Sequence, residues 1–203
     1  MAAAQVVAGT GDDLIVGGDG AGNDTYNGGT GIDTVKYTSA LAGIAVDLAK
    51  GSAKSLVKDN ARIGSDKLSN IENVIAGNYA DTITGSKASN ILTGGTGNDT
   101  FVFNTPLDAT TNVDTITDFS GGDKIALSKS IFKAFAKDKT IATEQLVYGD
   151  KTIENDDYLI YDQAAGKLYY DADGSGTKSK PIQIAIIGTD THPTLTAADF
   201  TII

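Results

Sequence analysis

The sequence has no cysteine and no tryptophan, and its single histidine is His192. These absences exclude thiol chemistry and disulfides, and they argue against most zinc sites and any histidine-dependent catalytic triad. His192 lies in the segment Thr-His-Pro-Thr with no nucleophile motif near it, so we interpret it as a solvated turn residue. We predict that the chain is not an enzyme in its own right, because its serines and aspartates occur without a base or a nucleophile elbow.

Basic residues and long apolar runs are scarce as well. The 203 residues include 16 lysines and arginines against 26 aspartates and glutamates, which gives a formal net charge of −10. Such a chain is a poor partner for nucleic acid or for an anionic membrane surface. It has no stretch of about 18 apolar residues that would form a transmembrane segment, and its N-terminus lacks the basic region of a Sec signal. If the protein is exported, it leaves by another route.

The abundant residues are those of turns and strands. Glycine and threonine occur 24 times each, and 23 of the 26 acidic residues are aspartate. Aspartate favours turns and sites for hard cations, whereas a charged helical surface would favour glutamate. An apolar content of 40% is too high for a disordered chain. The composition therefore predicts a turn-rich β protein.

A nine-residue repeat organises much of the chain. Each row has a turn, usually rich in glycine, followed by the form D-x-U-x, in which U is a large apolar residue; Asn90 replaces the aspartate in one row. The glycines turn with positive φ at little steric cost, and the last three residues make a short strand whose central side chain points inward. The rows are AGTGDDLIV (8–16), GGDGAGNDTYN (17–27), GGTGIDTVK (28–36), ARIGSDKLS (61–69), AGNYADTIT (76–84), GSKASNILT (85–93) and GGTGNDTFV (94–102).

These rows resemble the repeats-in-toxin family, whose nonapeptide GGxGxDxUx forms a calcium-binding parallel β-helix. The resemblance implies an all-β fold, a calcium-bound parallel β-roll of nonapeptide repeats with a β-rich C-terminal cap and one short helix. Two rows complete a coil, so row n lies about 4.8 Å from row n+2 and their aspartates face the same gap. Carboxylates and glycine carbonyls supply the six to eight oxygen ligands that suit calcium, and several ions are implied.

The candidate sites can be ranked by the stacking of their rows and by the glycines in their turns. Asp13 and Asp33 belong to stacked rows that both contain a Gly-x-Gly turn, so we predict the strongest site between them. Asp81 and Asp99 form the equivalent pair, but the turn before Asp81 has only Gly77, and we expect weaker binding there. The alternative for any single row is an aspartate in a solvated turn. The predicted metal-site residues are Gly9, Thr10, Gly11, Asp13, Asp24, Gly29, Thr30, Gly31, Asp33, Asp81, Gly95, Thr96, Gly97, Asp99, Asp114 and Asp118.

Some of these positions depend on how the two repeat arrays are joined. Asp24 would face Asp81 only if the arrays form one continuous roll. Asp66 would belong to a metal site only if its row stacks on the other rows. We divide the chain into a first repeat array (1–36), spacer strands with one degenerate repeat (37–75), a second repeat array (76–103), and a capping region with a C-terminal type I secretion signal (104–203).

The spacer contains apolar or alternating runs that predict short strands at 35–37, 44–48 and 71–75. We expect this region to continue or to flank the sheet. The lysines at positions 50, 54 and 58 are interpreted as part of a solvated loop.

The segment after residue 103 resembles the capping region of secreted proteases, lipases and adhesins of the family. Apolar residues within 131–136 predict a short amphipathic helix over the open end of the roll, and 157–171 predicts a β-hairpin. Asp114, Asp118 and Asp123 either close the last turn with a further calcium or cap strands, and both interpretations stay open at this point.

One further segment, DADGSGT, has partial EF-hand spacing. Asp171, Asp173 and Ser175 fall at ligand positions and Gly176 holds the sixth position, but Ile182 stands where the bidentate glutamate belongs. We therefore favour a tight hairpin turn.

The last residues, 181–203, resemble the C-terminus of proteins exported by type I secretion. The resemblance implies a calcium-binding repeat domain that folds on calcium outside the cell and carries the secretion signal of a larger protein. Its partner would be a type I exporter, and its location would be secreted, either extracellular or at the cell surface.

Two other functions stay open. A calcium-dependent adhesion or carbohydrate-binding module would take a cell-surface or extracellular polysaccharide as its partner. Ice binding would use Thr10, Thr30 and Thr96 as a regular outer row, although three rows make a very short face.

Overall fold

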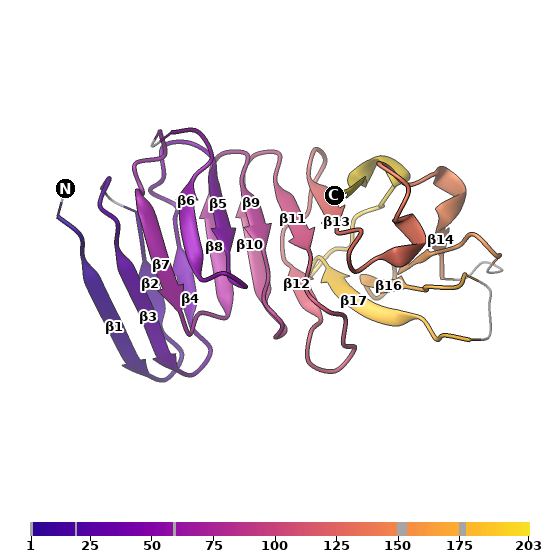
Figure 1. Cartoon of the computed structure of the whole chain (residues 1–203), viewed down its shortest axis with the longest axis horizontal. Coiled ribbons are helices and arrows are strands. Elements are labelled where there is room, and N and C mark those ends of the chain that lie inside the picture. Colours follow the sequence, from indigo (N-terminus) through magenta and orange to yellow (C-terminus); the bar gives the residue numbers. More distant parts are fainter. Residues whose placement is uncertain (1, 19, 59, 150–153, 175–177) are drawn as a thin grey trace.

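Short strands alternate with turns along the chain, and they form two facing β-sheets that make an elongated roll (Figure 1). The structure is a computed structural model that describes residues 2–18, 20–58, 60–149, 154–174 and 178–203. The N-terminus lies at one end of the roll, and the cap formed by the C-terminal part of the chain lies at the other.

Both sheets are mainly parallel, and in the described ranges each contains nine strands. The first sheet runs in the order β1 (Gln5–Thr10), β3 (Thr25–Thr30), β7 (Ser65–Ser69), β6 (Ser52–Ser55), β5 (Ile44–Asp47), β9 (Thr82–Thr84), β11 (Thr100–Phe103), β13 (Lys124–Leu127) and β18 (Phe200–Ile202). The second runs in the order β14 (Leu146–Tyr148), β15 (Leu159–Asp162), β16 (Lys167–Tyr170), β17 (Ile182–Ile187), β12 (Asp114–Ile116), β10 (Ile91–Gly95), β8 (Asn73–Gly77), β4 (Thr34–Lys36) and β2 (Leu14–Val16).

The rows of each array stack in the way that the nine-residue spacing predicts. Ile15 of β2 lies opposite Val35 of β4, and Ile83 of β9 lies opposite Phe101 of β11, in parallel register. In both pairs a row lies on the row two positions further along the chain. The all-β parallel roll predicted from the repeats is therefore confirmed.

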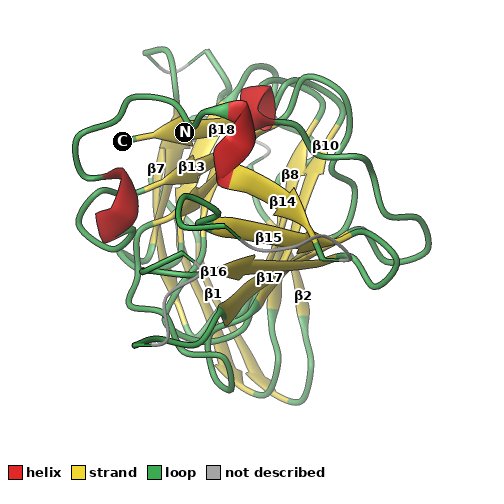
Figure 2. Ribbon diagram, turned by 90° about the vertical axis from the view of Figure 1, so that its right-hand side faces the viewer, coloured by secondary structure: helices red, strands yellow, loops and turns green. Residues whose placement is uncertain are grey.

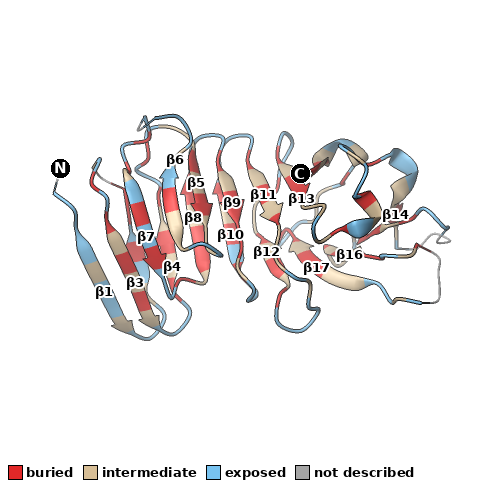
Figure 3. Ribbon diagram, viewed as in Figure 1, coloured by how far each residue is buried: buried red, intermediate tan, exposed pale blue. Residues whose placement is uncertain are grey.

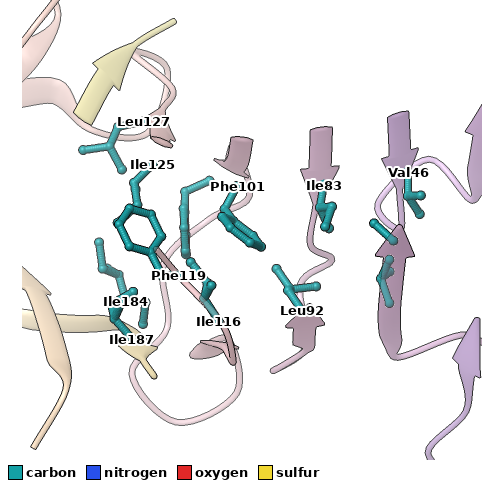
Figure 4. Packing of buried hydrophobic residues seen from close by; sticks show 14 of the residues in the cluster. Val46, Ile83, Leu92, Phe101, Ile116, Phe119, Ile125, Leu127, Ile184 and Ile187 are labelled. Carbon is teal, nitrogen blue, oxygen red and sulfur yellow. The ribbon is translucent and has the colours of Figure 1, made fainter. Parts of the chain in front are cut away.

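The hydrophobic core is a column of side chains between the two sheets. Ile83 and Phe101 of one sheet lie across from Leu92 and Ile116 of the other (Figure 4), and each of these four is at most 1% exposed. Because successive side chains of a strand point to opposite faces, one inward residue per three-residue strand is enough to build the column. Burial of a side chain of this size contributes roughly 1.5–3 kcal/mol.

The spacer joins the two arrays into one roll by different routes in the two sheets. In the second sheet β4 pairs directly with β8, and β8 pairs with β10. In the first sheet the antiparallel strands β5 and β6 lie between β7 and β9. The strands predicted at 44–48 and 71–75 correspond to β5 and β8, while β6 was not predicted. Because β6 and β5 intervene, Asp24 faces Asp66 and not Asp81.

The cap closes the C-terminal end of the roll (Figure 2). The predicted hairpin is formed by β15 and β16, and the segment predicted as a helix contains one 3₁₀ turn. Phe132 and Phe135 are fully buried and make edge-to-face contacts with Tyr170 and Tyr158. The three 3₁₀ turns of the described cap are η1 (Lys133–Phe135), η2 (Thr143–Gln145) and η3 (Ala197–Asp199).

The end of the chain returns to the roll as β18, which pairs in parallel with β13. Phe200 and Ile202 are buried, whereas Ile203 is 56% exposed. In the part of the chain that the structure describes, no helix has the length and apolar character needed to cross a membrane.

Candidate metal centre

The aspartates of the repeat rows form a ladder of hydrogen bonds from coil to coil. The backbone N–H of Asp13 donates to Asp33 Oδ1 at 2.9 Å, and the N–H of Asp81 donates to Asp99 Oδ1 at 2.8 Å. Thus each carboxylate reaches toward the coil on its N-terminal side. The structure brings together both of the aspartate pairs that the row spacing predicts.

The ladder has members that the repeat pattern did not identify. The N–H of Asp33 donates to Glu72 Oε2 at 2.8 Å, and the N–H of Asp99 donates to Asp123 Oδ1 at 2.8 Å. Asn73 pairs with Thr34, so Glu72 occupies the aspartate position of an unrecognised row, whose only signal in the sequence is the form E-x-U-x in Glu-Asn-Val-Ile.

Three carboxylates of the ladder have an oxygen with no partner. Asp13 Oδ2, Asp33 Oδ2 and Asp81 Oδ2 are buried and have no hydrogen bond within the described ranges. An unpaired buried charge is costly, so a cation partner would stabilise such oxygens. A calcium ion, which takes carboxylate and carbonyl oxygens, fits this need.

Glycines create the space beside carboxylates of the ladder. A Cβ on Gly28 would lie 2.4 Å from Asp33 Oδ2, and a Cβ on Gly94 would lie 2.3 Å from Asp99 Oδ2. Real Cβ atoms do not approach so closely, so the gap beside each carboxylate exists only because these residues are glycine.

Backbone carbonyls of one turn lie close against the glycines of the turn stacked on it. A Cβ on Gly29 would lie 1.9 Å from the carbonyl oxygen of Gly9, and a Cβ on Gly31 would lie 2.2 Å from that of Gly11. The predicted site residues Thr10 and Thr30 are register partners between these turns.

The second array repeats part of this arrangement. A Cβ on Gly95 would lie 1.9 Å from the carbonyl oxygen of Gly77, which also accepts the N–H of Thr96 at 3.0 Å. Gly97 lies against the backbone of Tyr79, where the first array has glycine. The predicted ranking of the two sites stays a prediction.

Burial affects the protonation of the ladder carboxylates. It raises the pKa of Asp81 to about 7, of Asp99 to about 6 and of Asp114 to about 7. Hydrogen bonds from backbone N–H groups act in the opposite direction but do not cancel the loss of hydration. Without a cation, these three carboxylates therefore bind protons at pH values well above those at which an ordinary aspartate does.

Asp24 and Asp66 are stacked like the other pairs but have different partners. The N–H of Asp24 donates to Asp66 Oδ1 at 2.8 Å, and the N–H of Ala4 donates to Asp24 Oδ1 at 2.7 Å. The hydroxyls of Tyr26 and Tyr37 donate to the remaining oxygens, Asp24 Oδ2 and Asp66 Oδ2, each at 2.9 Å. Every oxygen of this pair thus has a protein donor, which leaves less need for a cation.

Asn90 stands where the other rows have an aspartate. Its side-chain amide is a hydrogen-bond donor, which a carboxylate is not. Its side-chain amide donates to the carbonyl oxygen of Glu72 at 2.6 Å, and its Oδ1 accepts the N–H of Ser86 at 2.6 Å. The N–H of Asn90 itself donates to Asp114 Oδ1 at 3.0 Å. An asparagine at this position therefore donates directly to a neighbouring backbone carbonyl oxygen.

The aspartates after the last row differ in their contacts. Both oxygens of Asp118 accept backbone N–H groups, from Gly94 at 3.0 Å and from Gly95 at 2.7 Å. Asp123 Oδ2 accepts the N–H of Ser120 at 2.7 Å. These contacts favour strand capping for Asp118 and Asp123, and they leave Asp114 as the candidate ligand of this group.

The segment with partial EF-hand spacing forms hydrogen bonds typical of a closed turn. Asp171 Oδ1 accepts the N–H of Asp173 at 3.2 Å and the hydroxyl of Ser179 at 3.1 Å. Ser175 and Gly176 lie outside the described residues. Across the ranges that are described, no group of three or more acidic or histidine side chains gathers around a common centre. Any ion between the turns would therefore need backbone carbonyl ligands as well as carboxylate pairs.

Comparisons with known proteins identify the family of the chain. Residues 26–202 match the family model described as Peptidase M10 serralysin C terminal, and residues 5–35 match the RTX calcium-binding nonapeptide repeat. No curated protein sequence matches the chain. Among solved structures, the AlgE6R3 subunit of the Azotobacter vinelandii mannuronan C5-epimerase is similar at 17% identity and a TM-score of 0.39, over 97% of this chain and 80% of that one. Because the serralysin model covers most of the chain, this protein belongs to the serralysin C-terminal family, as a calcium-binding repeat region of a type I secreted, extracellular protein.

Proposed function

We propose that calcium drives the folding of this chain outside the cell, and that the chain carries the secretion signal of a larger protein. The observation that supports the calcium step is the set of buried, unpartnered oxygens on Asp13, Asp33 and Asp81. In a calcium-poor compartment these buried oxygens have no partner, which disfavours the packed roll. Where calcium is plentiful, the ion supplies the missing partner.

Calcium is expected to raise the melting temperature of the chain, and an excess of chelator is expected to lower it. Extracellular calcium modules bind with dissociation constants of roughly 0.1–1 mM. At a tenfold excess over that constant, each independent site stabilises the fold by about 1.4 kcal/mol, or about 3–6 °C for a domain of this size. Circular dichroism during calcium titration and thermal melting measures both effects.

Magnesium is the matched control for this experiment. It demands near-ideal octahedral geometry and gives up its waters reluctantly, so it should shift the melting temperature far less than calcium does. An identical spectrum and melting temperature in calcium and in chelator would contradict the proposal that calcium drives folding.

Asp33→Asn is expected to remove one strongly bound calcium while leaving the coil folded. The asparagine keeps an oxygen for the N–H of Asp13, and its amide can donate to a carbonyl oxygen as Asn90 does. Calorimetry and native mass spectrometry should therefore count one fewer ion.

The matched control is Asp118→Asn, because both Asp118 oxygens already accept backbone N–H groups. This variant should lose stability by about 1–3 kcal/mol but keep the calcium count of the parent. If Asp33→Asn kept the parent count and affinity, the assignment of the strongest site would be wrong.

In chelator, the folded chain is expected to become more stable as the pH falls from about 7.5 to about 5. The raised folded-state pKa values of Asp81, Asp99 and Asp114 lie above the unfolded value of about 3.9. The folded state thus binds more protons in this window, and the stabilisation is fully present below the unfolded pKa and lost as the pH rises through about 6–7. One pKa unit at one carboxyl corresponds to about 1.4 kcal/mol, so we expect a gain of at least that size.

In saturating calcium, the chain should instead lose stability as the pH falls, because protons then compete with the ion for the same oxygens. Urea unfolding at the two pH values, with and without calcium, measures all four stabilities. A calcium-free chain that loses stability on acidification would contradict the assignment of buried, uncompensated carboxylates.

The proposed secretion signal includes the terminal strand. The pairing of β18 with β13 buries Phe200 and Ile202 in the folded protein. A type I exporter would therefore read this segment in the unfolded chain, and folding outside the cell would hide it.

A further inference from the structure

A small pocket lies beside the spacer, on the first sheet. It has a volume of about 250 Å³ and forms where the turn before β3, the strand β6 with its following loop, and the start of β7 meet. That loop is largely exposed (Figure 3). The pocket contains two lysines and an asparagine but no acidic residue, and its lining residues are Ala21, Asn23, Lys54, Ser55, Lys58, Gly64 and Ser65.

This lining is unusual for a chain with a net charge of −10. The segment 50–67 has five basic residues against two acidic ones. Lys50 pairs with Asp47 at 2.7 Å, whereas Lys54 and Lys58 are exposed and form no ion pair in the described ranges. Two ammonium groups at the pocket thus have no carboxylate partner among the residues that the structure describes.

Asn23 occupies a position at which the first repeat row has an aspartate. Asp12 Oδ1 accepts the N–H of Ile32 at 2.8 Å, and Asn23 Oδ1 accepts the N–H of Ser65 at 2.9 Å in the same way. The asparagine makes this contact between coils without a negative charge, and its amide N–H groups add two donors. The pocket therefore gains donors where a carboxylate would repel an anion.

The aspartates next to the pocket residues are directed into the roll. Asp24 and Asp66 each follow a pocket residue in the sequence, and both are buried. The hydroxyls of Tyr26 and Tyr37 donate to their Oδ2 atoms at 2.9 Å. Because successive side chains of a strand point to opposite faces, these carboxylates do not line the pocket.

Hydroxyl groups complete the set of donors. Ser55 Oγ is buried and has no hydrogen-bond partner within the described residues. Ser65 is the register partner of Lys54, so their side chains lie on the same face of the sheet. Gly64 leaves the space between these groups open, since a Cβ there would lie 2.9 Å from Asn23 Oδ1.

We propose that this pocket binds a tetrahedral oxyanion, a sulfate or phosphate group, through Lys54, Lys58 and Asn23 with the two serine hydroxyls. The volume suits a small group and lies below the range of pockets that hold larger ligands. Donors from three separate segments approach from different directions, which suits a tetrahedral anion better than a planar carboxylate. Lysine binds such groups as a point charge. The site uses no carboxylate of the ladder and is separate from the calcium function proposed above.

The test is a titration of the full chain, folded in calcium, with sodium sulfate and separately with methyl phosphate. Binding is followed by the backbone amide chemical shifts of Asn23 and Ser65. We expect shifts that saturate, with half-saturation at about 1–10 mM for at least one of the two anions. Sodium chloride at equal ionic strength and sodium acetate are the controls, and neither should give a saturating shift.

Asn23→Asp is the most specific variant, because it keeps the acceptor for the N–H of Ser65 and replaces a donor by a negative charge. We expect the anion affinity to fall by about tenfold or more with little change in melting temperature. Lys54→Gln and Lys58→Gln should each weaken binding by about two- to fivefold. Lys36→Gln makes the same change of charge on β4 of the other sheet, so it should weaken binding by less than about twofold.

Circular dichroism establishes that each variant is folded before its titration, so a failure of the calcium proposal is detected separately. The absence of a saturating shift with both anions would overturn the proposal. An Asn23→Asp variant that binds as tightly as the parent would do so too. If Lys36→Gln and Lys54→Gln weakened binding equally, the response would reflect net charge alone, and the pocket would not be the site.

Discussion

Deletion of the last five residues, 199–203, is expected to destabilise the folded chain by about 3–6 kcal/mol, because Phe200 and Ile202 each bury a large side chain. The deletion also exposes the edge of β13, which loses its partner on that side. Urea unfolding in saturating calcium measures the loss. A change below about 1 kcal/mol would mean that β18 contributes little to packing.

The same deletion also removes the proposed secretion signal, so a second variant is needed to separate the two effects. Phe200→Ala combined with Ile202→Ala keeps the full length of the tail but loses its burial. Coexpression with a type I exporter then compares the three chains in the medium. Equal secretion of the deleted and the full-length chain would remove the signal proposal and leave only the structural role of β18.

Gly29→Ala is expected to disrupt severely the turn of the first proposed calcium site. Gly29 has a φ of +107°, and its new Cβ would lie 1.9 Å from the carbonyl oxygen of Gly9. The backbone strain alone costs about 1–3 kcal/mol, and the clash forces the two stacked turns apart. We expect a larger loss of stability than from strain alone, together with the loss of the calcium that we propose Asp13 and Asp33 bind.

Gly9→Ala separates the two causes. Gly9 has a φ of +120°, yet its Cβ would meet no atom within 4 Å. This variant should therefore show the strain without the clash, with a loss of about 1–3 kcal/mol and an unchanged calcium count. If both variants lost the same stability and the same ion, the close approach of the stacked turns would not matter.

The repeat pattern predicted the parts of the fold that depend on local spacing. The form D-x-U-x placed Ile15, Val35, Ile83 and Phe101 inward, and the two-row coil stacked Asp13 on Asp33. These features follow from the two-residue step from D to U within a row and from the stacking of rows two repeats apart, where strand alternation and turn geometry act directly.

The features that the sequence did not reveal depend on contacts between distant segments. Tyr37 lies outside the repeats and donates to Asp66, 29 residues away, so no spacing rule connects them. Strand β6 has the polar sequence Ser-Ala-Lys-Ser, which gives little strand signal, and it is held by antiparallel pairing on both sides. Glu72 was missed because its row lacks the glycines by which the other rows are recognised.

The direction of the hydrogen-bond ladder means that damage to one coil is transmitted to its neighbour on one side only. A carboxylate removed at Asp33 leaves the N–H of Asp13 without an acceptor, and one removed at Asp99 does the same to Asp81. In each case the coil that loses its partner precedes the altered residue in the sequence. Fraying therefore spreads toward the N-terminus, and the coils nearest the cap form the more protected part of the roll.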